Sequence, residues 1–231
     1  MNLVLSNEHG GNRIPARYRA LFKGAETILD SHRGWDPGSL QFAKQLAQCT
    51  RAPLAYCETS RLIVDLNRPL THRKLFSEWT RPLPDEERQT LIRRWWQPHH
   101  AQVVENIEAG GRGPSLHLSL HSFVPVWEGE ARKVDVGFLY DPSRQLEREF
   151  AGLWIEQIRQ RAPALRVRRN QPYRGIDPGL IPVLRSRFSA RSYVGIELEI
   201  SQAFPLGPAA PWRKLRCDLI ETFEVVLKEF D

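Results

Sequence analysis

Short apolar runs alternate along this chain with longer segments of helical periodicity. Leu116, Leu118 and Leu120, for example, alternate with polar neighbours, which is the period-two pattern of a β-strand. Patterns of this kind predict strands at residues 2–6, 53–57, 116–120, 134–138, 164–169 and 192–200.

Between the strands, apolar residues recur at the three- and four-residue spacing of an amphipathic helix. Leu146, Phe150 and Trp154 fall on one face of such a segment. Pro98 lies inside another and should kink or divide it, because proline lacks a backbone N–H. The pattern predicts helices at residues 39–49, 85–109, 143–161 and 212–230.

Strands separated by helices are typical of an α/β protein with a largely parallel sheet. No stretch of linker-like composition divides the chain. We therefore expect a single domain over residues 1–231, with a mixed, mostly parallel sheet and helices on both faces.

Composition narrows the class of protein. The 231 residues are 41% hydrophobic and 10% aromatic, which argues against disorder. No apolar run approaches the roughly 18 residues of a membrane span, and the N-terminus lacks the features of a signal peptide. The three cysteines show no metal-finger spacing and suggest reduced thiols, so we expect a cytoplasmic protein without a membrane partner.

The charge balance first suggests a nucleic-acid partner. Lys and Arg number 33 against 27 Asp and Glu, a net charge of +6. The excess is spread along the chain, however, and the sequence contains no basic helix, aromatic-rich RNA strand or zinc-finger spacing. We therefore expect no nucleic-acid partner, although a basic nucleic-acid-binding protein remains an alternative.

Candidate chemistry gathers where the predicted strands end, which is where open α/β sheets bind their ligands. Histidines and carboxylates at such positions are the ligands that a catalytic zinc site uses. Each residue alone also has a structural interpretation, such as capping a helix or turn or facing solvent at a sheet edge. The candidates at strand ends are Glu8, His9, Thr59, Ser60, Arg61, His121, Ser122, Glu197, Glu199 and Gln202.

Several sequence blocks resemble the N-formylglutamate amidohydrolase family, and they occur in the family's order over nearly the whole chain. The most specific are Ser60-Arg61 with Asp65-Leu66-Asn67-Arg68, and His121-Ser122-Phe123. The full set of blocks spans residues 6–15, 32–38, 60–69, 120–123, 135–142, 170–175 and 195–200.

The resemblance implies a fold like that of the zinc carboxypeptidases, the phosphorylase/hydrolase-like fold, and a metal-activated water that attacks an amide. It implies Zn²⁺ as cofactor, with another divalent metal as the alternative. His9 and His121 match the family's histidine ligands, and Asp36 is the expected third ligand. Glu8 and His32 are its rivals for that place.

The resemblance also implies a general base on the last strand. Glu199 matches the family pattern best, and Glu197 is the alternative. Arg61 and Arg68 are the first candidates for binding a substrate carboxylate, because a guanidinium matches that group bidentately. Asn67 is counted with them, although the favoured interpretation of Asp65 and Asn67 is that they orient the loop that carries Arg68. Arg185 and Arg187 are second choices, and a structural ion pair is the alternative for each arginine.

The leading hypothesis is a metal-dependent amidohydrolase that releases formate, or another small acyl group, from an N-acyl amino acid. N-formyl-L-glutamate, an intermediate of histidine degradation, is the first candidate. Departures from the family's metabolic members at residues 7–11 and 32–36 leave the substrate open. Hydrolysis of another N-acyl amino acid or of a cell-wall amide, and an inactive metabolite-binding protein, are the alternatives; the oligomeric state also stays open.

Overall fold

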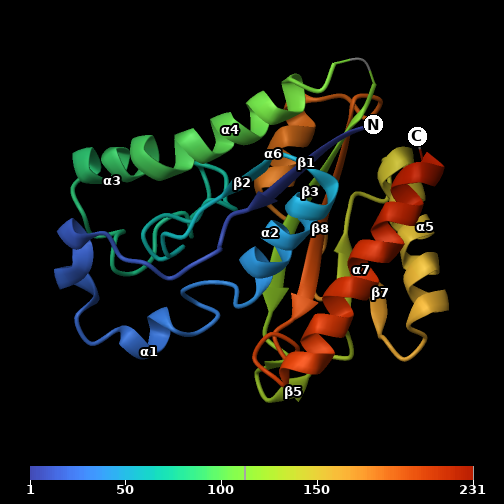
Figure 1. The fold of residues 1–231 in the computed structure, drawn as a ribbon. Helices are drawn as coiled ribbons and strands as arrows, with labels where there is room; N and C mark the ends of the chain where they lie inside the picture. Colours follow the sequence, from blue (N-terminus) through green and yellow to red (C-terminus); the bar gives the residue numbers. More distant parts are fainter. Residues whose placement is uncertain (112, 231) are drawn as a thin grey trace.

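The computed structural model describes residues 1–111 and 113–230. A six-stranded sheet forms its centre (Figure 1), and the strands lie in the order β2-β1-β3-β8-β6-β7. The strands are β1 (Asn2–Asn7), β2 (Leu54–Tyr56), β3 (Ser115–Phe123), β6 (Val136–Leu139), β7 (Val167–Arg169) and β8 (Tyr193–Ser201).

The strand directions make the sheet mixed but mostly parallel. β2, β1, β3 and β8 pair in parallel, β6 runs antiparallel to β8, and β7 is parallel to β6. The carboxyl ends of β1, β3 and β8 therefore meet at one edge, which Figure 1 draws at the lower end of β3 and β8. This confirms the predicted fold class.

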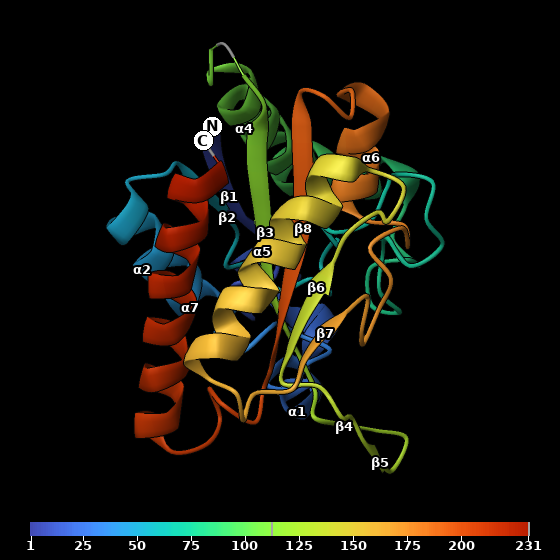
Figure 2. The same ribbon diagram turned by 90° about the vertical axis from the view of Figure 1, so that its right-hand side faces the viewer.

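Helices cover both faces of the sheet (Figure 2), as the sequence predicted. Even-numbered residues of β3, such as Leu116 and Leu118, are buried in the core beneath three helices on one face. On the other face, Val4 and Tyr193 pack against two helices in a smaller core. The first face carries α2 (Ser39–Thr50), α5 (Gln145–Arg161) and α7 (Ala209–Phe230), and the second carries α4 (Gln97–Glu108) and α6 (Leu180–Arg187).

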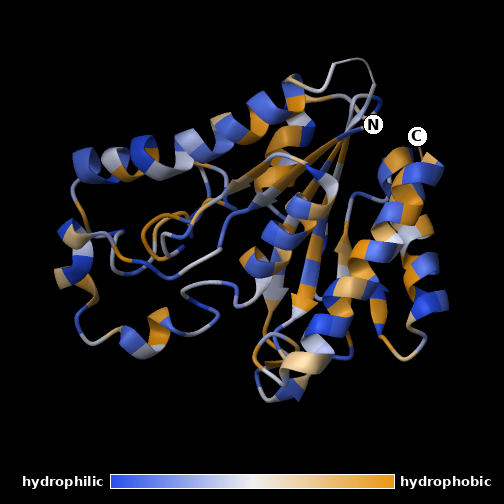
Figure 3. Cartoon of the chain, viewed as in Figure 1, coloured by the Kyte–Doolittle hydropathy of each residue, from blue (hydrophilic) through white to orange (hydrophobic). Residues whose placement is uncertain are grey.

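The hydropathy of the chain follows this arrangement. In Figure 3 the central strands are largely hydrophobic, whereas the helices alternate between hydrophobic and hydrophilic residues along their length. No helix in the described part of the chain is long and apolar enough to cross a membrane.

A separate apolar cluster lies beside the sheet, at the left of Figure 1. It includes buried Tyr18, Phe22, Ile63 and Leu91, which come from the segments that follow β1 and β2. These segments contain η1 (Ala16–Phe22), α1 (Glu26–Leu29) and α3 (Asp85–Leu91). Because the cluster holds residues 62–66 in place, it also anchors the loop that continues to Arg68.

Several elements differ from the sequence prediction. The helix expected over 85–109 is divided by a π-helical turn, η2 (Ile92–Trp96), so the division comes just before Pro98. The strands expected from 134 and 164 begin only at Val136 and Val167. The sequence prediction also omitted α6 and the small hairpin of β4 (Val126–Trp127) and β5 (Glu130–Ala131).

Candidate active site

A polar pocket of about 330 Å³ opens at the carboxyl ends of the central strands. The parallel topology explains its composition, because residues that follow β1, β3 and β8 are brought to the same edge. Ten of the candidate site residues named from the sequence line it: His9, His32, Asp36, Arg61, Asn67, Arg68, His121, Ser122, Glu197 and Glu199.

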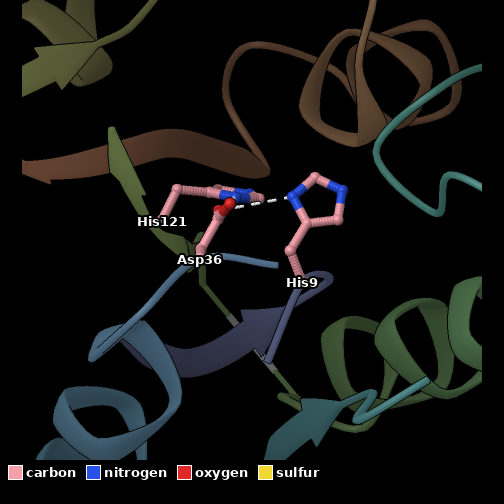
Figure 4. Close-up of side chains that lie close together, drawn as sticks. All are labelled: His9, Asp36 and His121. Atoms are coloured by element: carbon pink, nitrogen blue, oxygen red, sulfur yellow. Dashed lines mark hydrogen bonds and ion pairs between the residues drawn. The ribbon is translucent and has the colours of Figure 1, made fainter. Parts of the chain in front are cut away.

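His9, Asp36 and His121 form a buried group on the floor of this pocket (Figure 4). The Asp36 Oδ2 atom lies 2.7 Å from His121 Nδ1 and 3.3 Å from His9 Nδ1. One potential ligand atom from each of the three residues lies within 4.8 Å of the others. Two imidazoles and a carboxylate are a donor set that suits zinc, so the group could hold a metal ion.

Local structure brings these three side chains together. His9 directly follows β1, and His121 lies near the end of β3. Asp36 lies just before α2, where its backbone N–H donates to the His9 carbonyl at 2.9 Å. Ser39, in the first turn of α2, donates its hydroxyl to the Asp36 carbonyl at 2.7 Å and so stabilises this approach.

The outer nitrogen of each histidine is held by a further carboxylate. His9 Nε2 lies 2.7 Å from Asp65 Oδ1, and His121 Nε2 lies 2.8 Å from Glu8 Oε2. Carboxylates commonly bind the second nitrogen of metal-ligating histidines, which sets the tautomer and the ring orientation. Here both contacts leave Nδ1 directed at Asp36, and this orientation fits a metal ion between the three side chains.

The electrostatics of the group favour ionised carboxylates. Burial opposes ionisation of Asp36, but the charge of His9 and hydrogen bonds from both histidines lower its pKa below the ordinary value. The same balance holds for Glu8, whose pKa is lowered well below its ordinary value by His121 and His99. Burial likewise opposes a charged His121, yet the surrounding carboxylates, Glu197 foremost, raise its pKa well above the ordinary value.

Glu199 presents a free carboxylate oxygen beside this group. It pairs in register with His121 across β3 and β8 and is only 5% exposed. Its Oε2 atom is buried and has no hydrogen-bond partner among the described residues. Burial raises the pKa of Glu199 well above its ordinary value, and the charge of Glu197 raises it further against the effect of His121. A buried carboxylate with a raised pKa can both accept a proton and return it.

Glu197 lies on the same face of β8 but is already engaged. Its Oε2 accepts a hydrogen bond from Asn67 Nδ2 at 3.3 Å. Asn67 Oδ1 in turn accepts from the Leu180 backbone N–H at 2.7 Å. Asn67 therefore ties the loop before Arg68 to both β8 and α6.

Residues 1–204 match the family of N-formylglutamate amidohydrolases. This chain belongs to that family. The sequence motifs had indicated the same family, and the match confirms it.

Individual relatives cover nearly the whole amidohydrolase chain. N-formylglutamate deformylase of Pseudomonas aeruginosa is 26% identical over 261 residues, covering 98% of this chain and 90% of the relative. The crystal structure of a gene product from Agrobacterium tumefaciens is 28% identical, with a TM-score of 0.83 and coverage of 99% of this chain and 91% of that chain. N-formylglutamate amidohydrolase from Ralstonia eutropha shares the fold at 19% identity, with a TM-score of 0.66 and coverage of 98% and 93%.

Glu8 and His32, the alternatives to Asp36 as the third ligand of the amidohydrolase, lie outside the His–Asp–His group. Glu8 lies behind His121, where its other oxygen contacts His99 Nε2 at 3.1 Å. His32 lines the pocket farther out, with its ring edge-to-face against Trp127 at a centroid distance of 6.0 Å. Asp36 thus contacts both His9 and His121, whereas Glu8 contacts His121 through the other ring nitrogen.

The cations of the pocket fall into two kinds. Arg61 is bound to the floor, with Nη2 2.7 Å from Asp65 Oδ2 and Nη1 3.6 Å from Asp36 Oδ1. Arg68 donates from Nη1 to the Pro178 carbonyl at 2.7 Å and has no carboxylate partner in the described part of the chain. The sequence prediction omitted two further lining cations, Lys74 and Arg174.

Arg185 and Arg187 are not brought to the pocket. Arg185 is buried in the interior, where Nη2 lies 2.7 Å from Glu147 Oε2. Arg187 pairs with Glu108 at 2.6 Å on the surface. Both arginines form structural ion pairs, the alternative that the sequence had left open.

Sequence reasoning did not predict that Asp65 and His99 contact the site, since it assigned Asp65 only to orienting the loop that carries Arg68. Asp65 belongs to the same motif as Arg68, so its motif was a signal that could have located it. His99 lies in α4, about 90 residues from Glu8 in sequence, and no local pattern marks it. Its role depends on how α4 packs across β1.

Proposed function

We propose that this amidohydrolase is metal-dependent and releases formate, or another acyl group, from an N-acyl derivative of an acidic amino acid. N-formyl-L-glutamate is the first candidate, in keeping with the names of the family and of its relative from Pseudomonas aeruginosa. The observation that carries the proposal is the buried His–Asp–His group beside a carboxylate oxygen that has no partner among the described residues.

His9 Nδ1, His121 Nδ1 and the Asp36 carboxylate would hold the metal ion. A divalent cation bound there, with Zn²⁺ as the first choice, would supply Lewis acidity for the substrate carbonyl and for the attacking water. Asp65 and Glu8 keep the two histidines in the orientation that this role requires.

Glu199 is the proposed general base. Its unpartnered Oε2 accepts a proton from the attacking water and later donates it to the leaving amine. A pKa raised by burial suits both steps, because a carboxylate with an ordinary pKa would hold that proton too weakly to return it. Glu197 is the alternative, but its hydrogen bond with Asn67 engages one oxygen.

The cations around the opening support an acidic substrate. Arg68, Lys74 and Arg174 line the pocket, and no ion pair engages them within residues 1–111 and 113–230. A glutamate moiety offers two carboxylates that such cations can bind. Arg61, which forms an ion pair with Asp65, is the residue that we propose to stabilise the negative charge that develops on the carbonyl oxygen.

The basic residues outside the pocket give no support to the alternative of nucleic-acid binding. Exposed arginines are often paired with neighbouring carboxylates, as in the pairs Arg166–Asp135 and Arg187–Glu108. The cysteines at positions 49, 57 and 217 are free thiols, which agrees with the proposed cytoplasmic location.

The proposal is tested by formate release from a panel of N-formyl amino acids. Zinc-loaded protein should hydrolyse N-formyl-L-glutamate and N-formyl-L-aspartate with a higher kcat/KM than N-formyl-L-leucine. Equal rates on the leucine derivative would remove the acidic-substrate part of the proposal. Absence of formate release from every member of the panel would overturn deformylation itself.

A further inference from the structure

The β4–β5 hairpin presents an exposed tryptophan to the pocket. Glu128 and Gly129 form its two-residue turn, both with positive φ (51° and 84°), as is typical of a tight hairpin. Trp127 is 46% exposed and lines the pocket. Its neighbour Val126 is 52% exposed and does not line the pocket.

Trp127 belongs to a set of three rings that Arg132 holds together. The Arg132 guanidinium lies 5.5 Å from the ring centre of Phe123, 5.4 Å from that of Trp127 and 5.1 Å from that of Tyr173. It also donates a hydrogen bond to the Tyr173 hydroxyl at 3.1 Å. All three rings line the pocket, and we call Phe123, Trp127 and Tyr173 the aromatic wall.

The aromatic wall is continuous with the proposed reaction centre. Phe123 follows His121 by two residues in β3, so the two side chains leave the strand on the same side. At the outer end, Trp127 contacts His32, which lies four residues before Asp36. The wall and the His–Asp–His group therefore line one continuous pocket.

Of the cations proposed to bind carboxylate, Arg68 lies elsewhere around the opening, whereas Arg174 directly follows Tyr173 of the wall. The Arg68 carbonyl accepts a hydrogen bond from Trp96 Nε1 at 2.8 Å, which anchors Arg68 to the π-helical turn before α4. Figures 1 and 2 both draw α4 toward the top of the molecule and the β4–β5 hairpin at the bottom. In a trans amide, the acyl substituent and the amino-acid carbon lie on opposite sides of the C–N bond.

The protein leaves two of the three rings of this wall uncovered, since Trp127 is 46% and Tyr173 is 40% exposed, whereas Phe123 is only 2% exposed. A formyl group carries only a hydrogen on its carbonyl carbon and would cover none of it. Apolar side chains left exposed inside a ligand pocket commonly contact the ligand. We propose that the aromatic wall binds the acyl group of the substrate, and that N-acylglutamates with an apolar, planar acyl group larger than formyl are preferred over N-formyl-L-glutamate, which then remains a poorer substrate of the same site.

This inference rests on the proposed amidohydrolase function and narrows its substrate class. Its test compares the kcat/KM of glutamate release from N-formyl-, N-acetyl- and N-benzoyl-L-glutamate by the zinc-loaded enzyme. The benzoyl derivative should exceed the formyl derivative by about tenfold or more, a usual effect of filling an apolar subsite. A higher kcat/KM for the formyl derivative would overturn the inference.

Variants of the hairpin test the wall itself. Trp127→Ala should lower the benzoyl-to-formyl ratio about tenfold, whereas Trp127→Phe, which keeps a ring, should preserve most of it. Val126→Ala is the matched control, because it alters the same hairpin outside the pocket. A ratio that Trp127→Ala leaves unchanged would assign the preference to other residues and overturn the inference.

A binding measurement separates this inference from the proposed function. Calorimetry on Glu199→Gln should give tighter binding of N-benzoyl- than of N-formyl-L-glutamate. Tighter binding of the benzoyl derivative, without hydrolysis of any derivative by the unsubstituted protein, would support the inference about the aromatic wall and overturn the proposed function. Hydrolysis of the formyl derivative, with no preference for the benzoyl derivative in rate or in binding, would support the proposed function and overturn the inference about the aromatic wall.

Discussion

Glu8 and His121 form a fully buried pair in which Glu8 Oε2 lies 2.8 Å from His121 Nε2, directly behind the His–Asp–His group. The same oxygen accepts a hydrogen bond from the Ser119 hydroxyl at 2.6 Å. These contacts fix the ring of His121 with Nδ1 toward Asp36. The residue that precedes His9 in sequence therefore supports the other histidine of the group.

Replacing Glu8 by Gln should weaken metal binding without removing a ligand. Glu8 accepts hydrogen bonds at both carboxylate oxygens, from His121 and Ser119 at Oε2 and from His99 at Oε1. The glutamine amide has only one acceptor oxygen, so at least one of these donors loses its partner. Zinc affinity, measured by competition with a chromogenic chelator, should fall about 10–100-fold. The control is Glu105→Gln on the exposed face of α4. An unchanged affinity in the Glu8 variant would show that His121 needs no such support.

Replacing Glu199 by Gln should separate catalysis from metal binding. The amide keeps the shape of the side chain but cannot take a proton from water, so kcat should fall by about 10²–10⁴ while zinc content stays the same. Glu197→Gln is the comparison, and we expect it to retain more activity because Glu197 is hydrogen-bonded to Asn67. An active Glu199 variant with an inactive Glu197 variant would reverse the assignment.

Arg68→Ala should act mainly on substrate binding. A lost charge-assisted hydrogen bond is worth roughly 1.5–3 kcal/mol, which corresponds to an increase of about 10–100-fold in KM for N-acylglutamates. Arg187→Ala is a suitable control, because Arg187 is paired with Glu108 away from the pocket. An unchanged KM in steady-state kinetics would exclude Arg68 from carboxylate binding.

The parts of this molecule that could be predicted from sequence are those with strong periodicity or a dense motif. Alternating leucines predicted β3, and the topology rule then assigned His9 and His121 to one edge of the sheet. Asp36 was harder, because an aspartate just before α2 is equally typical of a helix cap. Its own contacts with both histidines bring it into the group.

The parts that sequence reasoning missed depend on packing between distant segments. α6 contains Pro182 in its first turn and only a short apolar stripe, so it resembled a loop. The link between His99 and Glu8 spans 91 positions, and the hydrogen bond from Arg132 to Tyr173 spans 41. Arg185 was expected near substrate but is buried against Glu147, a partner that no local pattern indicates.

His117 should make the stability of the protein depend on pH. It is buried between the Ser6 hydroxyl, 2.8 Å away, and the Tyr193 hydroxyl, 2.7 Å away. Burial lowers its pKa from 6.5 to about 4. The unfolded chain therefore takes up a proton first as the pH falls, and the stability contributed by neutral His117 is lost between pH 6.5 and 4.

The measurement is urea unfolding at several pH values between 7 and 4. The free energy of unfolding should fall less steeply toward low pH in His117→Gln than in the unsubstituted protein, because glutamine does not titrate. The slopes are compared rather than the absolute stabilities, since the variant also alters packing. Equal slopes would mean that His117 takes up no additional proton on unfolding.

Formate release from N-formyl-L-glutamate, measured before chelation, after removal of metal and after addition of Zn²⁺, tests metal-dependent hydrolysis most directly. We predict activity that chelation abolishes and zinc restores, together with a His121→Ala variant that neither binds zinc stoichiometrically nor regains activity. Full activity in protein shown by elemental analysis to contain no metal would contradict the proposed role of His9, Asp36 and His121.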